Sequence, residues 1–472
     1  MLHTMQIEVH NDHPLYPYFD TVLHLANNLY NVSLYHIRQV MTGIQKVQED
    51  RQPNERDVIE GIHRALPMMK DKFQMPTKEN WLLNYYFLNE YFLKTDNPDY
   101  QAPALPRQCA QNMIRKAVAD MISYLASLKK YRLDPSAYLG MPKLPGYKKS
   151  GGMCSMDFSN QTCRIIRESG KDVLSFGKTK ARLVLGKVLK SGWSLRQVMV
   201  KPRFDLFTVN IVLEDGIPQV DLMSETPERI CAIDLGIRNF AAISNNAGLP
   251  AILFKGGIIK SNNQWFSKKC AKLQSEQAAG ATNRFRSTPE YRKLGRKRQD
   301  QMKDFMHKTA KRLIRWCLEN RIDTVVVGTN SGWKQNASMS KENNQVFEQI
   351  PFEQFRKMLK YLCEWNGIRY VEQEESYTSQ ASFLMQDPIP VYKKGDSTKY
   401  RFSGRRSPKK HKEKSKKSGF HGLYQNNDGT IVNADLNGSA NIGRKCYPDL
   451  FQPQNVNLND VLVFTHPDFI KM

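Results

Sequence analysis

Two aspartates in this sequence stand where they could hold catalytic metal ions. Asp234 lies near the end of the apolar run 229–236, which predicts a buried strand with a carboxylate at its rim. Asp435 begins a predicted helix over 433–442, whose small residues at 438–440 would let it approach a sheet closely. Two carboxylates brought to one sheet edge suit a magnesium-dependent phosphodiester nuclease, because two hard cations need oxygen ligands on both sides of the scissile phosphate.

The composition favours a polyanionic partner. The chain has 472 residues, with 70 Lys and Arg against 46 acids, which gives a formal net charge of +24. A surplus this large carries self-repulsion, so nucleic acid fits it better than the alternative of a basic protein without such a partner. No apolar stretch approaches the ~20 residues of a membrane-spanning helix, and the N-terminus lacks a secretory pattern. We therefore expect an intracellular protein with no membrane partner.

The eight cysteines indicate neither disulfides nor a thiolate metal site. They are scattered, without any Cys-x-x-Cys pair, and three of them lie in apolar surroundings. Reduced, structural thiols explain this pattern best.

The first third of the chain is predicted to be helical. Over 108–128 the apolar residues recur every three or four positions, which indicates an amphipathic helix. The aromatic block 81–93 could stack on bases, but aromatic residues at helical spacing more often form a core, and that interpretation is preferred. Pro and Gly residues over 134–146 end the helical region. We assign 15–135 to a helical nucleic-acid recognition domain.

Alternating apolar residues predict strands on either side of that region. The pattern is clear over 207–213, and a short stretch at 5–9 matches it. We predict a small β-barrel from residues 1–14 and 136–227, with the helical domain inserted. Its outer surface would be basic and suited to a phosphate backbone, although an ordinary solvated surface is the alternative. The candidate contacts are Lys178, Lys180 and Arg182.

The remainder, 228–472, is predicted to be an α/β domain. Four near-continuous apolar runs alternate with helical stretches, which is typical of a sheet covered on both faces. The runs are 230–233, 240–243, 324–327 and 368–371.

A basic insertion, 376–430, interrupts this domain. Between Lys393 and Lys417 it has twelve Lys or Arg residues and two acids, so it cannot bury enough apolar surface to order itself. We interpret it as a flap that guides a single strand; a solvated charge run and a localisation signal are the alternatives. The candidate contacts are Lys393, Lys394, Arg405, Arg406, Lys409 and Lys410.

The ordered motifs resemble those of the TnpB group of transposon-encoded RNA-guided endonucleases and of the compact type V CRISPR effectors. The resemblance covers most of the chain, with weaker matches at 140–146 and 158–161. The strongest matching residues, in the family's chain order, are Asp234-Leu-Gly236 with Asn239, Gly328-Thr-Asn330, Trp333-Lys-Gln335, Glu374-Glu-Ser-Tyr-Thr-Ser379, Phe402-Ser-Gly-Arg-Arg406 and Asp435-Leu-Asn-Gly-Ser-Ala-Asn-Ile442.

The resemblance implies an RNase H-like, RuvC-type nuclease domain, a guide RNA and target DNA beside a short duplex motif. Base pairing would then select most of the target sequence. It also implies a two-metal Mg²⁺ site. Members of the family commonly carry a four-cysteine zinc ribbon after the Tyr-Thr-Ser stretch, whereas this chain has Ala381-Ser-Phe-Leu384 there. We expect no zinc.

The third acid of the site departs from the family pattern. The family delivers it from a parallel strand beside the first one, but here that strand, 323–330, has Gly328 at the expected position. The following strand would lie about 4.8 Å further out, a gap that a glutamate could bridge over a residue without a side chain. We choose Glu375, with Glu374 in reserve. Asp234, Glu375 and Asp435 would then bind two Mg²⁺ ions and cut DNA.

Two other functions remain open at this point. The chain could be an RNA-guided DNA-binding repressor that has lost cleavage, which the missing acid at Gly328 suggests. It could also be a transposase with an RNase H-like core and no guide.

Overall fold

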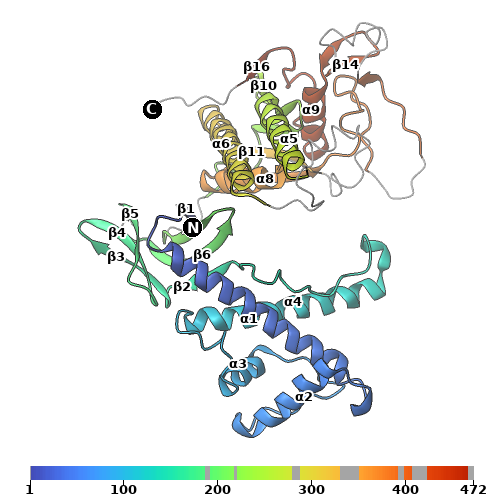
Figure 1. Ribbon diagram of the computed structural model, residues 1–472. Coiled ribbons are helices and arrows are strands. Elements are labelled where there is room, and N and C mark those ends of the chain that lie inside the picture. Colours follow the sequence, from blue (N-terminus) through green and yellow to red (C-terminus); the bar gives the residue numbers. More distant parts are fainter. Residues whose placement is uncertain are drawn as a thin grey trace. The chain divides into compact units, whose positions relative to one another are not determined.

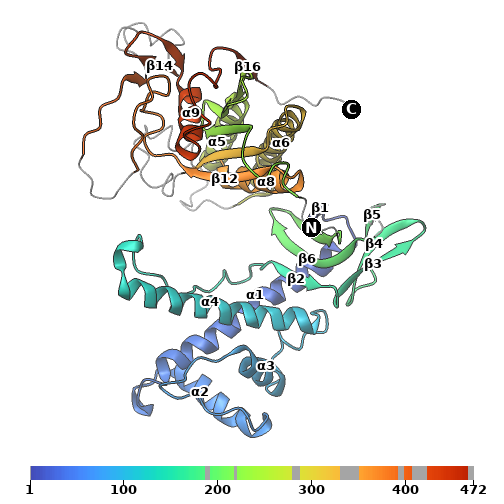
Figure 2. The same ribbon diagram turned by 180° about the vertical axis from the view of Figure 1, so that it is seen from behind.

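The structure is a computed structural model that describes residues 2–186, 192–216, 221–278, 287–329, 350–391, 398–406 and 422–465. The chain divides into two compact units, Met1–Ile217 and Pro218–Met472 (Figures 1 and 2). Each unit has its own hydrophobic core. The finer division into domains 1–14, 15–135, 136–227 and 228–472 stays a prediction.

Over its described residues, the first unit contains four α-helices around a shared core. They are α1 (Tyr16–Gly43), α2 (Pro53–Ala65), α3 (Tyr85–Lys94) and α4 (Arg107–Leu133). The predicted helix 108–128 is confirmed within α4. The aromatic block forms α3, where Asn84 caps the helix by accepting a hydrogen bond from the Phe87 N–H at 3.0 Å. Its core interpretation is confirmed by the burial of Phe87, Leu88, Tyr91 and Phe92, while Tyr86 is exposed.

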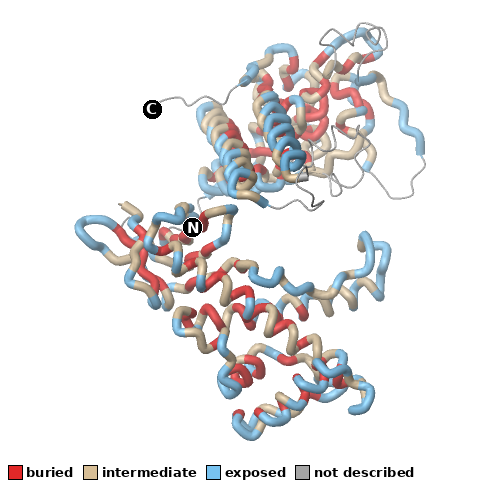
Figure 3. Tube along the Cα trace, in the orientation of Figure 1, coloured by how far each residue is buried: buried red, intermediate tan, exposed pale blue. Residues whose placement is uncertain are grey.

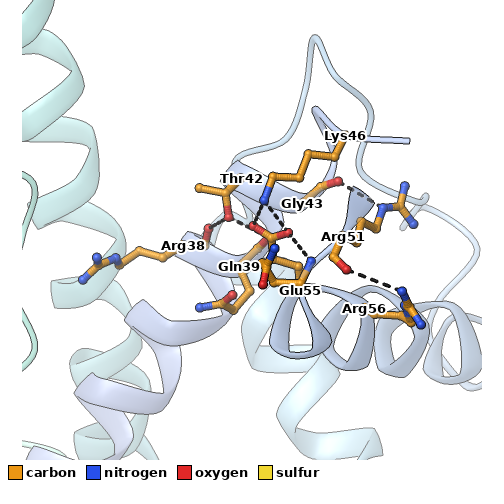
Figure 4. A network of polar contacts seen from close by, with 9 residues as sticks. Arg38, Gln39, Thr42, Gly43, Lys46, Arg51, Glu55 and Arg56 are labelled. Carbon is orange, nitrogen blue, oxygen red and sulfur yellow. Dashed lines mark hydrogen bonds and ion pairs between the residues drawn. The ribbon is translucent and has the colours of Figure 1, made fainter. Parts of the chain in front are cut away.

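The corner between α1 and α2 is fixed by one buried carboxylate, Glu55 (Figure 4). Both of its oxygens accept hydrogen bonds from Lys46 Nζ at 2.8 Å. Glu55 Oε2 also accepts from the Gln52 N–H at 2.9 Å, which closes a capping box at the start of α2. Gly43 permits this approach, because a Cβ atom there would lie 2.8 Å from the Cβ of Glu55.

Two antiparallel sheets complete the described part of this unit. The four-stranded one has the order β1-β7-β6-β2, and the three-stranded one has the order β3-β4-β5. The N-terminal strand β1 pairs along its whole length with β7, which confirms that the helices are inserted between paired strands. Closure of the two sheets into a barrel stays a prediction. The strands are β1 (Leu2–Val9), β2 (Met156–Ser159), β3 (Cys163–Glu168), β4 (Lys171–Phe176), β5 (Arg182–Gly186), β6 (Ser194–Arg203) and β7 (Leu206–Glu214).

A six-stranded mixed sheet forms the centre of the second unit, in the order β12-β11-β8-β9-β10-β16. Strand β11 pairs parallel with β8, and β12 pairs parallel with β11, as the sequence predicts. Strands β8, β9 and β10 pair antiparallel, and β16 adds in parallel to β10. The bounds are β8 (Ile230–Leu235), β9 (Asn239–Asn245), β10 (Ala251–Lys255), β11 (Thr324–Thr329), β12 (Arg369–Glu374) and β16 (Val461–Phe464).

Helices cover both faces of this sheet, so the α/β prediction is confirmed. On one face Cys231 and Ile233 pack with residues of α6 (Pro289–Glu319) and α8 (Phe352–Trp365). On the other face Ala232 and Val326 pack with α9 (Ala434–Cys446). In Figure 3 the exposed residues of α6 and of α5 (Gly257–Ala278) follow the outer sides of these helices.

A small antiparallel sheet lies beside α9 in the chain's last part. It consists of β13 (Gly404–Arg406), β14 (Leu423–Asn426) and β15 (Ile431–Asn433), in that order. Strand β15 leads directly into α9.

Candidate active site

Asp234 lies near the end of β8, on the sheet face that α9 covers. A Cβ atom at Gly438 of α9 would stand 2.7 Å from Asp234 Oδ2, closer than such atoms can pack. The small residue predicted to let the helix approach the sheet is therefore required at this position. Burial first, and then the nearby carboxylates Glu375 and Asp435, raise the pKa of Asp234 well above its ordinary range, while Arg406 acts in the opposite direction.

Asp435 lies in the first turn of α9, where the Asn433 side chain caps the helix. Asn433 Oδ1 accepts hydrogen bonds from the N–H groups of Asp435 at 3.0 Å and Leu436 at 3.1 Å. Of the two Asp435 carboxylate oxygens, one accepts a hydrogen bond from the guanidinium of Arg406 on β13. The other accepts from Asn239 Nδ2 at 2.7 Å.

Asn239 is held in that orientation by Lys255. The Lys255 ammonium donates to Asn239 Oδ1 at 2.9 Å, and because an ammonium only donates, the amide oxygen must face Lys255 and the amide nitrogen must face Asp435. Burial, and then repulsion from Arg238, lower the pKa of Lys255. Asn239 belongs to the first sequence motif, but nothing in the sequence pattern points to Lys255.

Glu375 follows β12, two strands away from Asp234. A Cβ atom at Gly328, on the strand between them, would lie only 2.6 Å from Glu375 Oε2. The glutamate therefore reaches over the glycine, as the sequence predicts. Its backbone is fixed by a hydrogen bond from the Glu375 N–H to the Thr329 carbonyl at 3.1 Å.

Glu374, the reserve residue, has other partners. Its Oε2 accepts a hydrogen bond from Lys445 Nζ and its Oε1 accepts from the Ser376 N–H, both at 2.6 Å. Burial acts to raise the pKa of Glu374, but these bonds outweigh it and lower the pKa. The structure thus brings Asp234, Glu375 and Asp435 together and directs Glu374 toward α9 and Ser376.

The chemistry of this donor set fits a hard cation. Its three groups are all carboxylates, which are the ligands Mg²⁺ prefers, and their mutual repulsion is visible in the raised pKa of Asp234. In the described part of the chain, no three His, Cys, Asp or Glu side chains are already arranged to hold a metal ion. The oxygens of Asp435 are bound by Arg406 and Asn239 instead.

The predicted nucleic-acid contacts have different surroundings. Lys178 and Lys180 are exposed between β4 and β5, whereas Arg182 donates to the Thr179 carbonyl at 3.2 Å. Arg405 is exposed on β13. Its neighbour Arg406 binds Asp435, a contact that sequence reasoning missed. The other predicted contacts, Lys393, Lys394, Lys409 and Lys410, lie outside the described residues.

The first unit contains an open groove of about 430 Å³. It runs between α1, α4 and the extended segment 142–146, and the weaker sequence match at 140–146 is the only signal of it. Asn31 fixes the chain just beyond that segment, since its side chain accepts from the Lys148 N–H at 2.8 Å and donates to the Lys148 carbonyl at 3.0 Å. The lining residues are Tyr30, Asp120, Ser123, Tyr124, Ser127, Pro142, Lys143, Pro145 and Gly146.

Two protein-family models match the second unit. The OrfB_IS605 model, described as a probable transposase, matches residues 218–334, and the Cas12f1-like TNB domain model matches residues 352–442. These matches confirm the resemblance to the TnpB group and the compact type V effectors. A comparison with curated proteins gave no match.

Several solved structures are similar at low identity. The Cas12f1–sgRNA–target DNA complex is 13% identical, with 93% of this chain and 98% of that chain covered and a TM-score of 0.33. Alicyclobacillus acidoterrestris C2c1 with single-guide RNA is 8% identical, with 94% and 88% covered and a TM-score of 0.47. CasPhi-2 (Cas12j) bound to crRNA is 9% identical, with 94% and 98% covered and a TM-score of 0.39. With TM-scores below 0.5, these likenesses support no conclusion about the site.

Proposed function

We propose that this protein is an RNA-guided DNA endonuclease of the RuvC type, with a catalytic site formed by Asp234, Glu375 and Asp435. The observation that carries the proposal is that these three carboxylates, from β8, the end of β12 and α9, lie close together. Gly328 leaves room for the Glu375 side chain, and Gly438 leaves room for that of Asp234. Burial and the two neighbouring carboxylates raise the pKa of Asp234, and a bound cation would stabilise such a group of carboxylates. A purely structural role would not need all three.

The partners follow from charge and family. A net charge of +24 suits two nucleic-acid strands, and the matched families and solved complexes include guide-bound effectors. In this proposal the first unit and the basic residues hold guide RNA and target DNA, and base pairing selects the sequence. The groove beside α4 is a candidate contact for the nucleic acid, because tyrosine rings and serine hydroxyls suit bases and phosphates.

Each residue of the site has a distinct part in the chemistry. Two Mg²⁺ ions, when bound, would activate water and stabilise the leaving oxygen. Asp234, fixed in the sheet, would be the most rigid of their ligands. Glu375 spans the adjoining strand to reach the same place, and Asn239 holds the Asp435 carboxylate in a defined rotation. Arg406, which binds Asp435 in the absence of metal, could turn to a phosphate group once a cation takes its place on that carboxylate.

A cleavage assay with magnesium, copurified RNA and matching DNA tests the proposal. We expect cutting that depends on RNA and Mg²⁺ and is abolished by Asp234→Ala or Asp435→Ala. Target affinity should stay nearly unchanged in both variants, since these residues contribute little to backbone binding. Equal loss of binding and cutting would contradict the assignment.

A guide-dependent DNA binder without nuclease activity is the second candidate. Both oxygens of Asp435 already accept hydrogen bonds from Arg406 and Asn239, which is the observation in its favour. Stable, RNA-dependent complexes that never cut at any Mg²⁺ concentration would establish this function instead. Binding of DNA without any copurified RNA would favour a guide-free transposase; the first family model is described as a probable transposase.

A further inference from the structure

Helix α9 presents a row of amide side chains to the irregular segment 376–390. Asn437 Nδ2 donates to the Ala381 carbonyl at 2.8 Å, and its Oδ1 accepts from the Phe383 N–H at 2.9 Å. One turn later, Asn441 Nδ2 donates to the carbonyls of Thr378 at 2.9 Å and Ala381 at 2.7 Å. Positions four apart share a helix face, so the two amides bind the same stretch, 378–383, and both donate to the Ala381 carbonyl.

These contacts are buried and mutually satisfied. Both asparagines have 0% exposure. A buried amide without partners destabilises the folded state, and the same holds for the backbone groups of an irregular segment. The row continues with Arg444, which donates to the Asp387 carbonyl at 2.6 Å and to Asn441 Oδ1 at 3.0 Å. The helix and segment therefore satisfy each other's polar groups.

The Asn441 contact leads directly to Glu375. Its acceptor, Thr378, makes two hydrogen bonds to the Glu375 carbonyl, from Oγ1 at 2.8 Å and from N–H at 3.2 Å. A shift of the Thr378 backbone would thus turn the backbone that orients the Glu375 side chain. The same helix bears Asp435 in its first turn and contacts Asp234 through Gly438.

We propose that Asn441 is a positioning residue for Glu375, and that it and Asn437 hold segment 376–390 in place. Hydrogen bonds from α9 order this segment. The inference rests on the proposed function only in treating Glu375 as a metal ligand. Helix α9 thus bears Asp435, leaves room for Asp234 at Gly438, and positions Glu375 through Asn441.

Calorimetric measurement of Mg²⁺ binding to the full-length protein tests this role. The Asp435→Ala variant, which lacks one proposed ligand, gives the background signal. Asn441→Ala should weaken binding roughly tenfold to a hundredfold, as loss of a residue that orients a metal ligand does. In a Glu375→Ala background, Asn441→Ala should cause no further weakening, because it acts through that residue. Equal weakening in both backgrounds, or a lower melting temperature with unchanged affinity, would overturn the proposal.

Two further variants guard against misfolding. Thr378→Val removes the side-chain hydrogen bond to Glu375 at nearly constant volume and should weaken Mg²⁺ binding without unfolding the helix. Ser439→Ala is the control, since its hydroxyl bonds within α9 to the Leu436 carbonyl at 3.0 Å; it should leave binding unchanged. A Thr378→Val variant that binds Mg²⁺ as the wild type does would also overturn the proposal.

Proteolysis separates this inference from the proposed function. If Asn441 holds the segment, Asn441→Ala should expose 376–390 to cleavage at protease concentrations that leave the wild type intact. Should the wild type bind no Mg²⁺ at all, the nuclease proposal fails, while this readout still decides whether the asparagine orders the segment. Unchanged proteolysis would reject that role.

Discussion

Asp234 Oδ2 and Gly438 lie so close that a Cβ atom at 438 would stand 2.7 Å from the carboxylate oxygen. Gly438 lies in the first half of α9, where a glycine lowers helix stability because it loses more backbone freedom on folding than other residues do. Its position is explained by the carboxylate it must admit. The pair joins the sheet to the helix at the site itself.

Gly438→Ala should therefore impair cutting without unfolding the protein. Alanine favours the helix by up to about 1 kcal/mol, which offsets part of the crowding, but the added methyl group must displace Asp234 or the helix. We expect cleavage to fall at least about tenfold, in keeping with the effect of small misplacements in catalytic sites. Gly257→Ala, at the start of α5, is the matched control, because a Cβ there meets nothing within 4 Å. Full activity of Gly438→Ala would show that the contact is not tight.

Glu375→Gln and Glu374→Gln should have opposite outcomes. The first removes a carboxylate that faces Asp234 and should reduce cleavage by a factor of about 1,000, the scale of several kcal/mol of metal-dependent stabilisation. The second weakens the contacts of Glu374 with Lys445 and the Ser376 N–H but leaves the three proposed metal ligands in place, and it should retain most activity. Single-turnover cleavage at saturating Mg²⁺ compares the two. Loss of activity in Glu374→Gln alone would reverse the assignment.

Arg406 competes with a metal ion for Asp435, because its guanidinium already neutralises one carboxylate oxygen. Arg406→Gln should consequently bind Mg²⁺ several-fold more tightly in the absence of DNA, as measured by calorimetry. The exposed neighbour Arg405 provides the control, and Arg405→Gln should leave the affinity unchanged. Weaker binding in Arg406→Gln would mean that the arginine supports the site instead of competing for it.

The sequence predicted the strands that bear the acids in two steps. Apolar runs indicated β8, β11 and β12, and the resemblance to the TnpB group implied that the neighbouring runs pair in parallel, as they do in the structure. The length of a glutamate and the absence of a side chain at Gly328 then left one way to bridge the gap. Local pattern and the resemblance together led to Glu375, which stays the proposed third ligand.

The charged partners could not be predicted in the same way. Lys255 and Arg406 reach Asp435 and its amide partner from β10 and β13, far apart in the chain. Their approach depends on how separate elements fold together, and a lysine or arginine in a basic chain has no pattern that marks it. Asn441 stood within a motif, yet its acceptor, the Thr378 carbonyl, is a backbone atom that no sequence pattern reveals.

The last prediction concerns the pH dependence of stability in the first unit. Burial acts to raise the pKa of Glu55, but hydrogen bonds from Lys46, Thr42 and the Gln52 N–H outweigh it and lower the pKa from 4.5 to about 2. A carboxyl whose pKa is lower in the folded state stabilises the fold fully above its unfolded pKa of 4.5. That contribution is lost as the pH falls from 4.5 toward 2.

Glu55→Gln should thus lower the melting temperature of the first unit most at pH 7, where the wild-type carboxylate is ionised and Lys46 would be left with an amide (Figure 4). The difference from the wild type should shrink between pH 4.5 and pH 2, since protonation then removes the same charge from the wild type. Thermal unfolding monitored by circular dichroism across this range measures it. Glu49→Gln, an exposed acid on the short helix Gln48–Asp50, is the control and should follow the wild-type curve. A difference that stays constant with pH would mean that Glu55 acts through packing and not through its charge.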